Sequence, residues 1–391
     1  MQKDQTIIDF EIIWKKINHS ITEDEERFLN KWLNESPSHQ RYMDNAMQYY
    51  LEGSAFDDSK TISEKVWKAL VFSETKKRNH TSRWIIALSA AVIAIFLLMN
   101  YLLPDRKLEM ERFAIEKAAQ IKPGTNKALL ILNDGTAHDL TTSNDLLLNE
   151  GGSVIKSEGT KLTYSKEEAV IKEKEIKYNT LSIPRGGEFF LKLSDGTKVW
   201  LNSETVIRYP VQFSGKERRV ELMGEAFFEV AHNAKVPFIV ESGEQSVKVL
   251  GTEFNISSYK EDPLIYTTLV QGSVEVCFKN MPEIKQTLAP GEQSSINKLE
   301  AQILKHVVEP YKFVAWKEGR FIFDDKNLGE IMKTLSKWYN VEVIFASEEL
   351  RNYRFTGDLK RYADFGEVLK KIGKTNEVNF IIEKNKITIR Q

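Results

Sequence analysis

The sequence predicts a multidomain protein that crosses a membrane once, with a small α-helical domain first, an all-β region next and an α/β domain last. Three observations carry this prediction. Residues 84–104 are a run of 21 positions without a charged side chain. Apolar residues at helical spacing precede this run and recur beyond residue 320. Between these parts, apolar and polar residues alternate around tight turns, which is typical of β-strands.

Composition excludes several classes of function. The 391 residues correspond to two or three domains at about 150 residues each. Fifty-five basic and 56 acidic side chains leave a net charge of −1, so direct binding of nucleic acid is not expected. The single cysteine, Cys277, excludes an intrachain disulfide and any multi-cysteine zinc or iron–sulfur site. Because the nucleophile, phosphate-loop and dinucleotide motifs are missing, we expect neither catalysis nor a cofactor.

Residues 1–79 are predicted to form four short helices. The spacing of Thr22 and Glu25 is that of a capping box at the start of the second helix. Four helices of this size enclose a small core, and such a unit gains stability by burying apolar faces on a partner. Three tryptophans are candidate partner contacts, with packing in the domain's own core as the alternative. They are Trp14, Trp32 and Trp67.

Residues 84–103 are predicted to form a transmembrane helix. About 20 helical residues cross a bilayer core of about 30 Å, and Pro104 ends the helix. Trp84 and Tyr101 lie at opposite ends, where amphipathic rings anchor a span at the interface. A cleaved signal peptide is disfavoured by the long patterned segment before the run. A buried soluble helix, the other alternative, is usually shorter and interrupted by polar residues.

The charges beside this span predict its orientation. Lys76, Lys77, Arg78 and Arg83 crowd its N-terminal side, whereas acidic and basic residues are mixed on the other side. The positive-inside rule therefore places the N-terminus in the cytoplasm and the long C-terminal part outside.

The region after the span is predicted to be all-β, with stacked antiparallel strands or a β-helix-like arrangement. It comprises a membrane-proximal part (106–177), a central domain (178–276) and a β extension (277–318). Asp-Gly-Thr turns at 134–136 and 195–197 predict two similar hairpins. Glycines at regular intervals are interpreted as further turns. They are Gly224, Gly251, Gly272 and Gly291.

Several chemistry-bearing side chains in this region are assigned structural roles. Alternation puts Glu225 and Glu229 on one exposed strand face, so we interpret them as solvated rather than as a catalytic pair. Trp200, Phe227 and Phe228 alternate like core residues. No metal site is predicted, because three histidines of the region lack ligand neighbours at workable spacings. They are His138, His232 and His306.

Residues 319–391 are predicted to form a separate α/β domain. Strands at 321–323 and 341–345 flank a helix that carries Leu328 and Trp338. The pattern recurs beyond residue 352, which predicts βαβ followed by βαββ.

A series of short motifs runs through the outer part of the chain. They are 183–188 (IPRGGE), 193–202 (LSDGTKVWLN), 208–210 (RYP), 224–230 (GEAFFEV), 237–238 (PF), 249–255 (VLGTEFN), 290–293 (PGEQ), 316–321 (WKEGRF), 338–339 (WY) and 355–357 (FTG). By the first seven motifs, which occur in the family's order, the chain resembles the FecR-type transmembrane anti-sigma regulators of the form common in Bacteroidetes. The last three resemble the domain that follows FecR in these proteins, whose plan is similar to the short N-terminal domain of secretins and TonB-dependent transducers.

The resemblance implies a signalling protein of the cell inner membrane. Its cytoplasmic helices would hold an extracytoplasmic-function (ECF) sigma factor, and its periplasmic part would sense the extension of a TonB-dependent outer-membrane receptor. An intramembrane protease is a further expected partner, since relatives are thought to signal by proteolysis. Ser89 and Asn100 could ease unwinding of the span, with ordinary tolerance of small or interfacial polar residues as the alternative. The alternative is a membrane-anchored periplasmic glycan-binding or sensor protein that binds no sigma factor.

Overall fold

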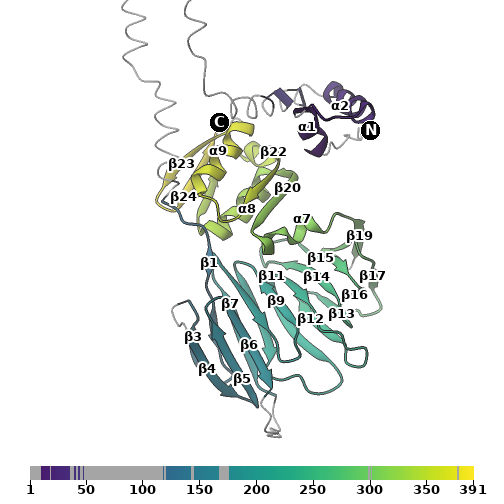
Figure 1. The fold of residues 1–391 in the computed structure, drawn as a ribbon, viewed down its shortest axis with the longest axis vertical. Coiled ribbons are helices and arrows are strands. Elements are labelled where there is room, and N and C mark those ends of the chain that lie inside the picture. Colours follow the sequence, from purple (N-terminus) through teal and green to yellow (C-terminus); the bar gives the residue numbers. More distant parts are fainter. Residues whose placement is uncertain are drawn as a thin grey trace, which may run out of the picture. The chain divides into compact units, whose positions relative to one another are not determined.

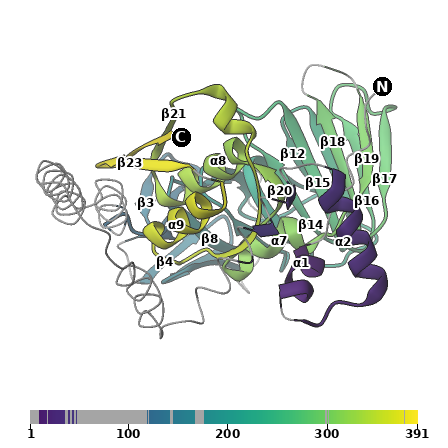
Figure 2. The ribbon, with the colours of Figure 1, turned by 90° about the horizontal axis from the view of Figure 1, so that it is seen from above.

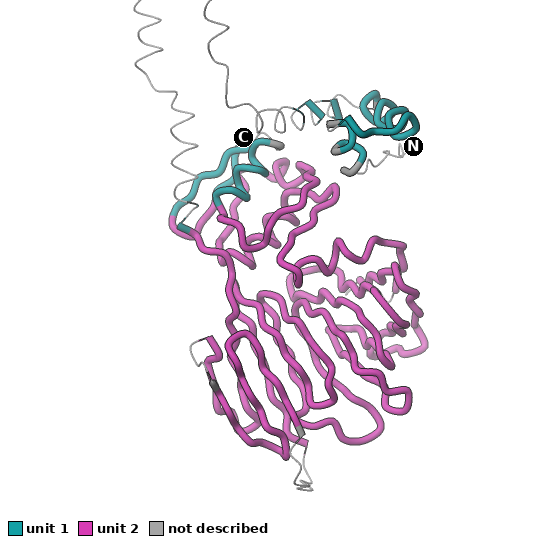
Figure 3. The backbone as a smooth tube through the Cα atoms, viewed as in Figure 1, with its two compact units in different colours: residues 1–120, 366–383, 388–391 teal, residues 121–365, 384–387 magenta. Residues whose placement is uncertain are grey.

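The structure, a computed structural model, consists of two compact units (Figure 3). Unit 1 comprises residues 1–120, 366–383 and 388–391, and unit 2 comprises residues 121–365 and 384–387. The predicted span 84–103 lies outside the described residues, and no helix within them is long and apolar enough to cross a membrane. The described residues are 10–17, 19–35, 39–40, 43–44, 47, 118, 120–141, 145–166, 176–297, 300, 302–376 and 378–391.

Unit 1 begins with helices α1 (Phe10–Ile17) and α2 (Glu23–Glu35), which confirm the first two predicted helices. The capping box is also confirmed, because the Thr22 hydroxyl and backbone N–H both donate to the Glu25 carboxylate. Lys15 Nζ lies 2.7 Å from Glu25 Oε1 and joins the two helices. The hydrogen bonds from Lys15 and then from Thr22 lower the pKa of Glu25 to about 2.

Unit 2 is dominated by two β-sheets that pack face to face and share one long strand, β11 (Arg218–Glu229) (Figures 1 and 2). In the first sheet the order is β3 (Ala137–Asp139), β2 (Leu129–Ile131), β7 (Tyr178–Ile183), β10 (Thr205–Pro210), β11, β12 (Phe238–Ser242), β13 (Gln245–Val249), β16 (Val274–Phe278) and β17 (Lys285–Leu288). In the second sheet it is β4 (Asp145–Glu150), β5 (Ser153–Glu158), β6 (Lys161–Lys166), β8 (Gly187–Lys192), β9 (Lys198–Leu201), β11, β14 (Glu253–Ser258), β15 (Leu264–Gln271), β18 (Glu292–Asn297) and β19 (Ile303–Val307). The short strand β1 (Thr125–Asn126) pairs in parallel with the start of β8.

The pairing confirms the all-β prediction in its stacked antiparallel form. Most neighbouring strands run antiparallel, and the parallel pairs are β1–β8, β6–β8 and β11–β12. Inward residues of both sheets form one core, in which Phe228 stacks on Phe254 with ring centroids 5.1 Å apart. Each such aromatic side chain contributes about 1.5–3 kcal/mol through burial.

Both predicted Asp-Gly-Thr hairpins are present. The turns join β2 to β3 and β8 to β9, and in each the aspartate accepts a hydrogen bond from the threonine N–H. Of the four glycines interpreted as turns, Gly251, Gly272 and Gly291 lie between strands. Gly224 does not, because it lies inside β11 where this strand passes from the first sheet to the second.

The C-terminal part confirms the alternation of strands and helices. Asn327 caps α8 by accepting a hydrogen bond from Glu330 N, and Asn340 ends it in the left-handed conformation. Strands β20 and β22 pair antiparallel. The elements are α7 (Tyr311–Val314), η1 (Ala315–Glu318), β20 (Arg320–Asn327), α8 (Leu328–Tyr339), β21 (Glu342–Phe345), η2 (Glu348–Asn352), β22 (Arg354–Lys360), α9 (Phe365–Asn376), β23 (Asn379–Glu383) and β24 (Lys386–Arg390).

The passage of β11 between the sheets predicts a severe effect of Gly224→Ala. The residue has φ = +108°, and a Cβ would lie 2.6 Å from Thr205 Oγ1 and 2.7 Å from Glu204 O. Backbone strain and steric overlap together should lower the free energy of unfolding by about 3–5 kcal/mol. Chemical denaturation of the purified full chain, followed by tryptophan fluorescence, measures this loss.

Gly215→Ala is the matched control. Gly215 has φ = +104°, and a Cβ there would meet no atom within 4 Å among the described residues. It should therefore show the strain alone, about 1–2 kcal/mol. Equal losses at the two positions would contradict the steric argument.

Candidate functional site

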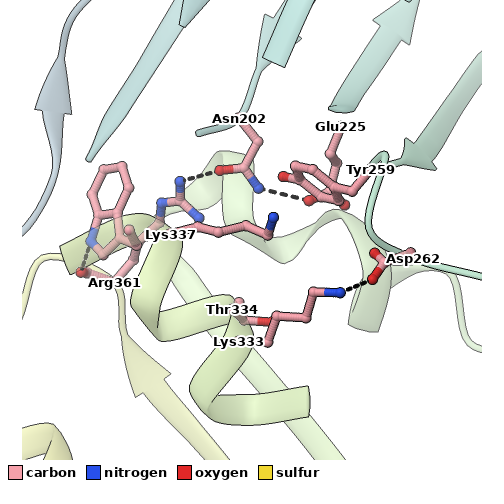
Figure 4. A pocket seen from close by; sticks show the side chains of 9 residues that line it. Asn202, Glu225, Tyr259, Asp262, Lys333, Thr334, Lys337 and Arg361 are labelled. Carbon is pink, nitrogen blue, oxygen red and sulfur yellow. Dashed lines mark hydrogen bonds and ion pairs between the residues drawn. The ribbon is translucent and has the colours of Figure 1, made fainter. Parts of the chain in front are cut away.

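One end of the β-sheets carries a cluster of polar side chains that face residues 311–365, all within unit 2. Four parts of the β-sheets contribute to it: Asn202 after β9, Glu225 in β11, Asn255 in β14 and residues 184–188. Residues 184–188, which we call loop 184–188, comprise the turn after β7 and the first two residues of β8. We call this contact zone between the β-sheets and residues 311–365 the junction. Figure 4 shows its central side chains.

Glu225 organises the junction through two asparagines. Asn202 Nδ2 donates to Glu225 Oε2 at 2.7 Å, and Asn255 Nδ2 donates to Glu225 Oε1 at 3.0 Å. An ionised carboxylate accepts hydrogen bonds and donates none, so both amide groups turn their N–H bonds toward it. Both amide oxygens then face residues 311–365. Asn202 Oδ1 accepts from Arg361 Nη2 at 2.6 Å (Figure 4). Asn255 Oδ1 accepts from Trp316 Nε1 at 3.3 Å.

The environment of Glu225 corrects the expectation that this carboxylate is solvated on an exposed strand face. Desolvation by burial raises the pKa of Glu225, although the hydrogen bonds from Asn255 and Asn202 oppose the shift. Residues 311–365 cover this end of the strand, which alternation within β11 could not reveal. Glu229, on the same face, remains partly exposed and pairs with Lys198 at 2.7 Å.

Arg361 is the most enclosed charge of the junction, with 1% of its surface exposed. Its guanidinium carbon lies 3.8 Å from the ring centroid of Trp338, and Phe321 and Trp316 lie slightly farther away. Its Nε lies 3.3 Å from Glu188 Oε2. Burial lowers the pKa of Arg361, and the nearby Glu188 carboxylate opposes this shift. A desolvated cation–π contact of this kind contributes about 2 kcal/mol.

The last turn of α8 is held by a second set of charges. Lys337 Nζ donates to Glu204 Oε2 at 2.7 Å and lies 3.8 Å from the ring centroid of Tyr259. Arg185 Nη1 lies 2.8 Å from Glu204 Oε1, and its Nη2 donates to the backbone oxygen of Ser336 at 2.7 Å. Burial would raise the pKa of Glu204, but the hydrogen bonds from Lys337 and Arg185 outweigh it and the pKa is lowered.

A cavity of about 70 Å³ lies between these groups. This volume holds a few water molecules and is well below the roughly 300–1,000 Å³ of an organic ligand pocket. The geometry therefore suits a joint between two parts of the chain better than a substrate site. Its lining residues, shown in Figure 4, are Asn202, Glu225, Tyr259, Asp262, Lys333, Thr334, Lys337, Trp338 and Arg361.

The residues predicted from sequence as partner or membrane contacts lie elsewhere. Trp32 is 7% exposed, belongs to the small core of unit 1 and stacks on His39 with ring centroids 4.1 Å apart. This placement accords with the core-packing alternative, and contact of Trp32 with a partner stays a prediction. Trp14 lies in α1, and its side chain is outside the described residues, as are Trp67, Trp84 and Tyr101.

The three aromatic residues expected in the core divide between two clusters. Phe228 faces the interior of the sheets. Phe227 packs against Trp200 and, on the opposite face of the second sheet, is covered by Val314 and Trp316. Adjacent strand residues can both be buried here because α7 and η1 cover the outer face.

Sequence reasoning missed the junction itself. Asn202, Glu225 and Asn255 all belong to the motifs that carried the resemblance, and each interrupts an otherwise apolar strand pattern. The polar residues within these motifs were the available signal. Arg361 follows β22 in a polar stretch, where nothing in the sequence distinguishes it from a solvated arginine.

Comparison with known proteins identifies the family of the chain. The family model for FecR protein matches residues 179–275, and that for FecR, C-terminal matches residues 320–389. A crystal structure of a candidate anti-sigma factor from Parabacteroides distasonis ATCC 8503 is 32% identical, with a TM-score of 0.50, and the match covers 55% of this chain and 99% of that one. The chain belongs to the FecR family. A second crystal structure with the same description gives 32% identity, a TM-score of 0.50 and coverage of 54% and 98%. No curated protein matches the chain.

The two family matches show to which parts of the chain the junction residues belong. Asn202, Glu225 and Asn255 fall within the FecR match, Arg361 falls within the C-terminal match, and Trp316 lies between the two. The junction therefore brings residues of the FecR match into contact with Arg361 of the C-terminal match and with the segment between the two matches.

The raised pKa of Glu225 predicts a specific pH dependence of stability. Between the unfolded and the higher folded pKa, the folded state binds more protons, so its stability falls as pH rises. The free energy of unfolding of the wild type minus that of Glu225→Gln should therefore decrease from about pH 4.5 upward and level off above the folded pKa. The decrease should be about 1.4 kcal/mol for each pH unit that separates the two pKa values. Denaturant titrations of both proteins at a series of pH values measure this difference.

Glu221→Gln removes a carboxylate from an exposed position of the same strand and controls for the loss of charge. If the free energy of unfolding of the wild type minus that of Glu225→Gln instead increases with pH, the native junction favours the ionised form of Glu225 and the prediction is wrong.

Proposed function

We propose that this protein is an inner-membrane anti-sigma factor that controls an ECF sigma factor in response to a TonB-dependent outer-membrane receptor. The observation that carries the proposal is membership of the FecR family together with the likeness to candidate anti-sigma factors over nearly their whole length. The sigma factor would bind residues 1–79, and the receptor's periplasmic extension would act on the part beyond the span.

The described N-terminal helices support a binding role. Within the described part of residues 1–79, Ile13, Leu29, Trp32 and Met43 form a core of few side chains. Phe28 on α2 is 37% exposed beside charged neighbours, and an apolar side chain in this setting suits a protein contact. A small helical unit of this kind gains stability from its partner.

The membrane placement rests on the sequence. The uncharged run 84–104 and the basic residues before it support one crossing with the N-terminus in the cytoplasm. One helix meets no second span of its own chain, so a subtle rearrangement is difficult to transmit through it. Proteolysis of the outer part, followed by cleavage within the span, is the route we favour for release of the sigma factor.

The outer part supports sensing of a protein in preference to gripping a glycan. Glycan platforms use flat, exposed rings, whereas the planes of Phe190 and Trp200 meet at 70° and those of Trp200 and Phe227 at 63°. Phe227 is covered by residues of the linker between the domains. The junction is enclosed and its cavity is small, which favours a function through rearrangement of the protein over binding of a small molecule.

The first functional prediction concerns sigma-factor binding. Phe28→Ala should weaken retention of the cognate ECF sigma factor by about 30-fold if the side chain is an interface anchor worth about 2 kcal/mol. Co-purification of the sigma factor with the detergent-extracted full chain measures this.

Leu147→Ala, a 66% exposed position of β4, is the control and should retain the sigma factor. If the folded wild-type chain leaves the cognate sigma factor free, the anti-sigma proposal is wrong.

The second prediction concerns topology. A reporter active only in the periplasm should give signal when fused after residue 130 and none when fused after residue 75. Quantified reporter activity at matched expression tests it, and the opposite pattern would overturn both the orientation and the site of sigma-factor binding.

A further inference from the structure

The chain enters unit 2 through a short segment, residues 121–127, which we call the entry strap. Its strand β1 pairs Thr125 and Asn126 with Gly187 and Glu188 in parallel. Thr125 N donates to Gly186 O at 3.0 Å, and Lys127 N donates to Glu188 O at 3.3 Å. A ladder of two residues is a weak attachment, so the strap needs other contacts to remain in place.

The second attachment is the indole of Trp338. Gly124 is buried, and a Cβ on it would lie 2.5 Å from two carbons of the Trp338 ring. The backbone of the strap therefore rests directly on the indole, at a distance that a side chain would prevent. Trp338 is in turn positioned by Arg361, whose guanidinium stacks on it and whose backbone oxygen accepts from Nε1 at 2.6 Å.

The loop that pairs with the strap also depends on α8. Gly186 N donates to Lys337 O at 2.7 Å, and Arg185 Nη2 donates to Ser336 O at 2.7 Å. Both surfaces that hold the strap are thus supported by the last turn of α8. The next residues differ, because Ala128 and Leu130 are buried in the core of the sheets.

We propose that the entry strap is a latch that α8 holds closed. When α8 is displaced from the junction, Gly124 loses the indole, loop 184–188 loses its support and β1 separates from β8. Release frees seven residues, which span at most about 23 Å at about 3.3 Å per residue. The position of α8 thereby determines whether the chain that precedes residue 121 is held at this point or free. The latch is a property of the fold and does not depend on which partner the N-terminal helices bind.

Hydrogen exchange of the full-length chain in detergent micelles tests the latch at the amides of Thr125 and Lys127. Arg361→Lys weakens the seat of Trp338 without touching the strap, and should make both amides exchange at least tenfold faster while the amides of β2 keep the wild-type rate. Arg354→Lys is the matched control, since Arg354 is an exposed arginine of the same domain that pairs with Asp325 at 2.9 Å.

Gly124→Ala perturbs the latch from the other side. It should speed exchange in the strap and, because coupling is reciprocal, also in the last turn of α8. Strap amides that keep wild-type protection when Arg361→Lys loosens α8 would overturn the proposal. If Arg361→Lys also speeds exchange in β2, the test rests on Gly124→Ala alone. In that case, faster exchange of the strap amides without faster exchange in the last turn of α8 would rule out the coupling. None of these outcomes bears on sigma-factor binding.

Discussion

The carboxylate of Glu225 accepts hydrogen bonds and donates none, and the geometry of the junction follows from that asymmetry. It draws the N–H groups of Asn202 and Asn255 toward itself, which leaves their oxygens facing residues 311–365. The groups that meet these oxygens, on Arg361 and Trp316, are donors without acceptor capacity. Every hydrogen bond of the network thus has a fixed direction, and residues 311–365 fit the β-sheets in one orientation. A glutamine at position 225 would present an N–H group to amides that themselves donate.

A network of this kind specifies an arrangement more than it stabilises one. Burial opposes the charges of both Glu225 and Arg361, and a buried polar group that is satisfied contributes little net free energy. Attraction between the β-sheets and residues 311–365 comes largely from apolar contacts beside the network, where Phe227 and Trp200 meet Val314 and Trp316.

The sequence predicted those parts of the fold that local chemistry determines. The capping box of Thr22 and Glu25, the two Asp-Gly-Thr hairpins and the order of strands and helices beyond residue 320 depend on residues a few positions apart. The two failures have different causes. Alternation shows which face of a strand a residue occupies, but not what covers that face, so by itself it predicts a solvated Glu225. The prediction of a turn at Gly224 is wrong because a glycine at positive φ inside a strand looks the same in sequence as one between strands.

The directed network also limits how the junction can move. A small displacement of residues 311–365 from the β-sheets would leave Arg361, Trp316 and two amide oxygens buried without these partners, at about 1–3 kcal/mol for each group. A large displacement lets water satisfy them all. Intermediate positions are therefore the least stable, and residues 311–365 are either in place on the β-sheets or released from them. The last turn of α8 also supports loop 184–188 and the indole beneath Gly124. The change between the two states therefore acts on the point where the chain enters the β-sheets. The sheets themselves need not deform for a change at one end of the domain to reach the segment that leads out of it.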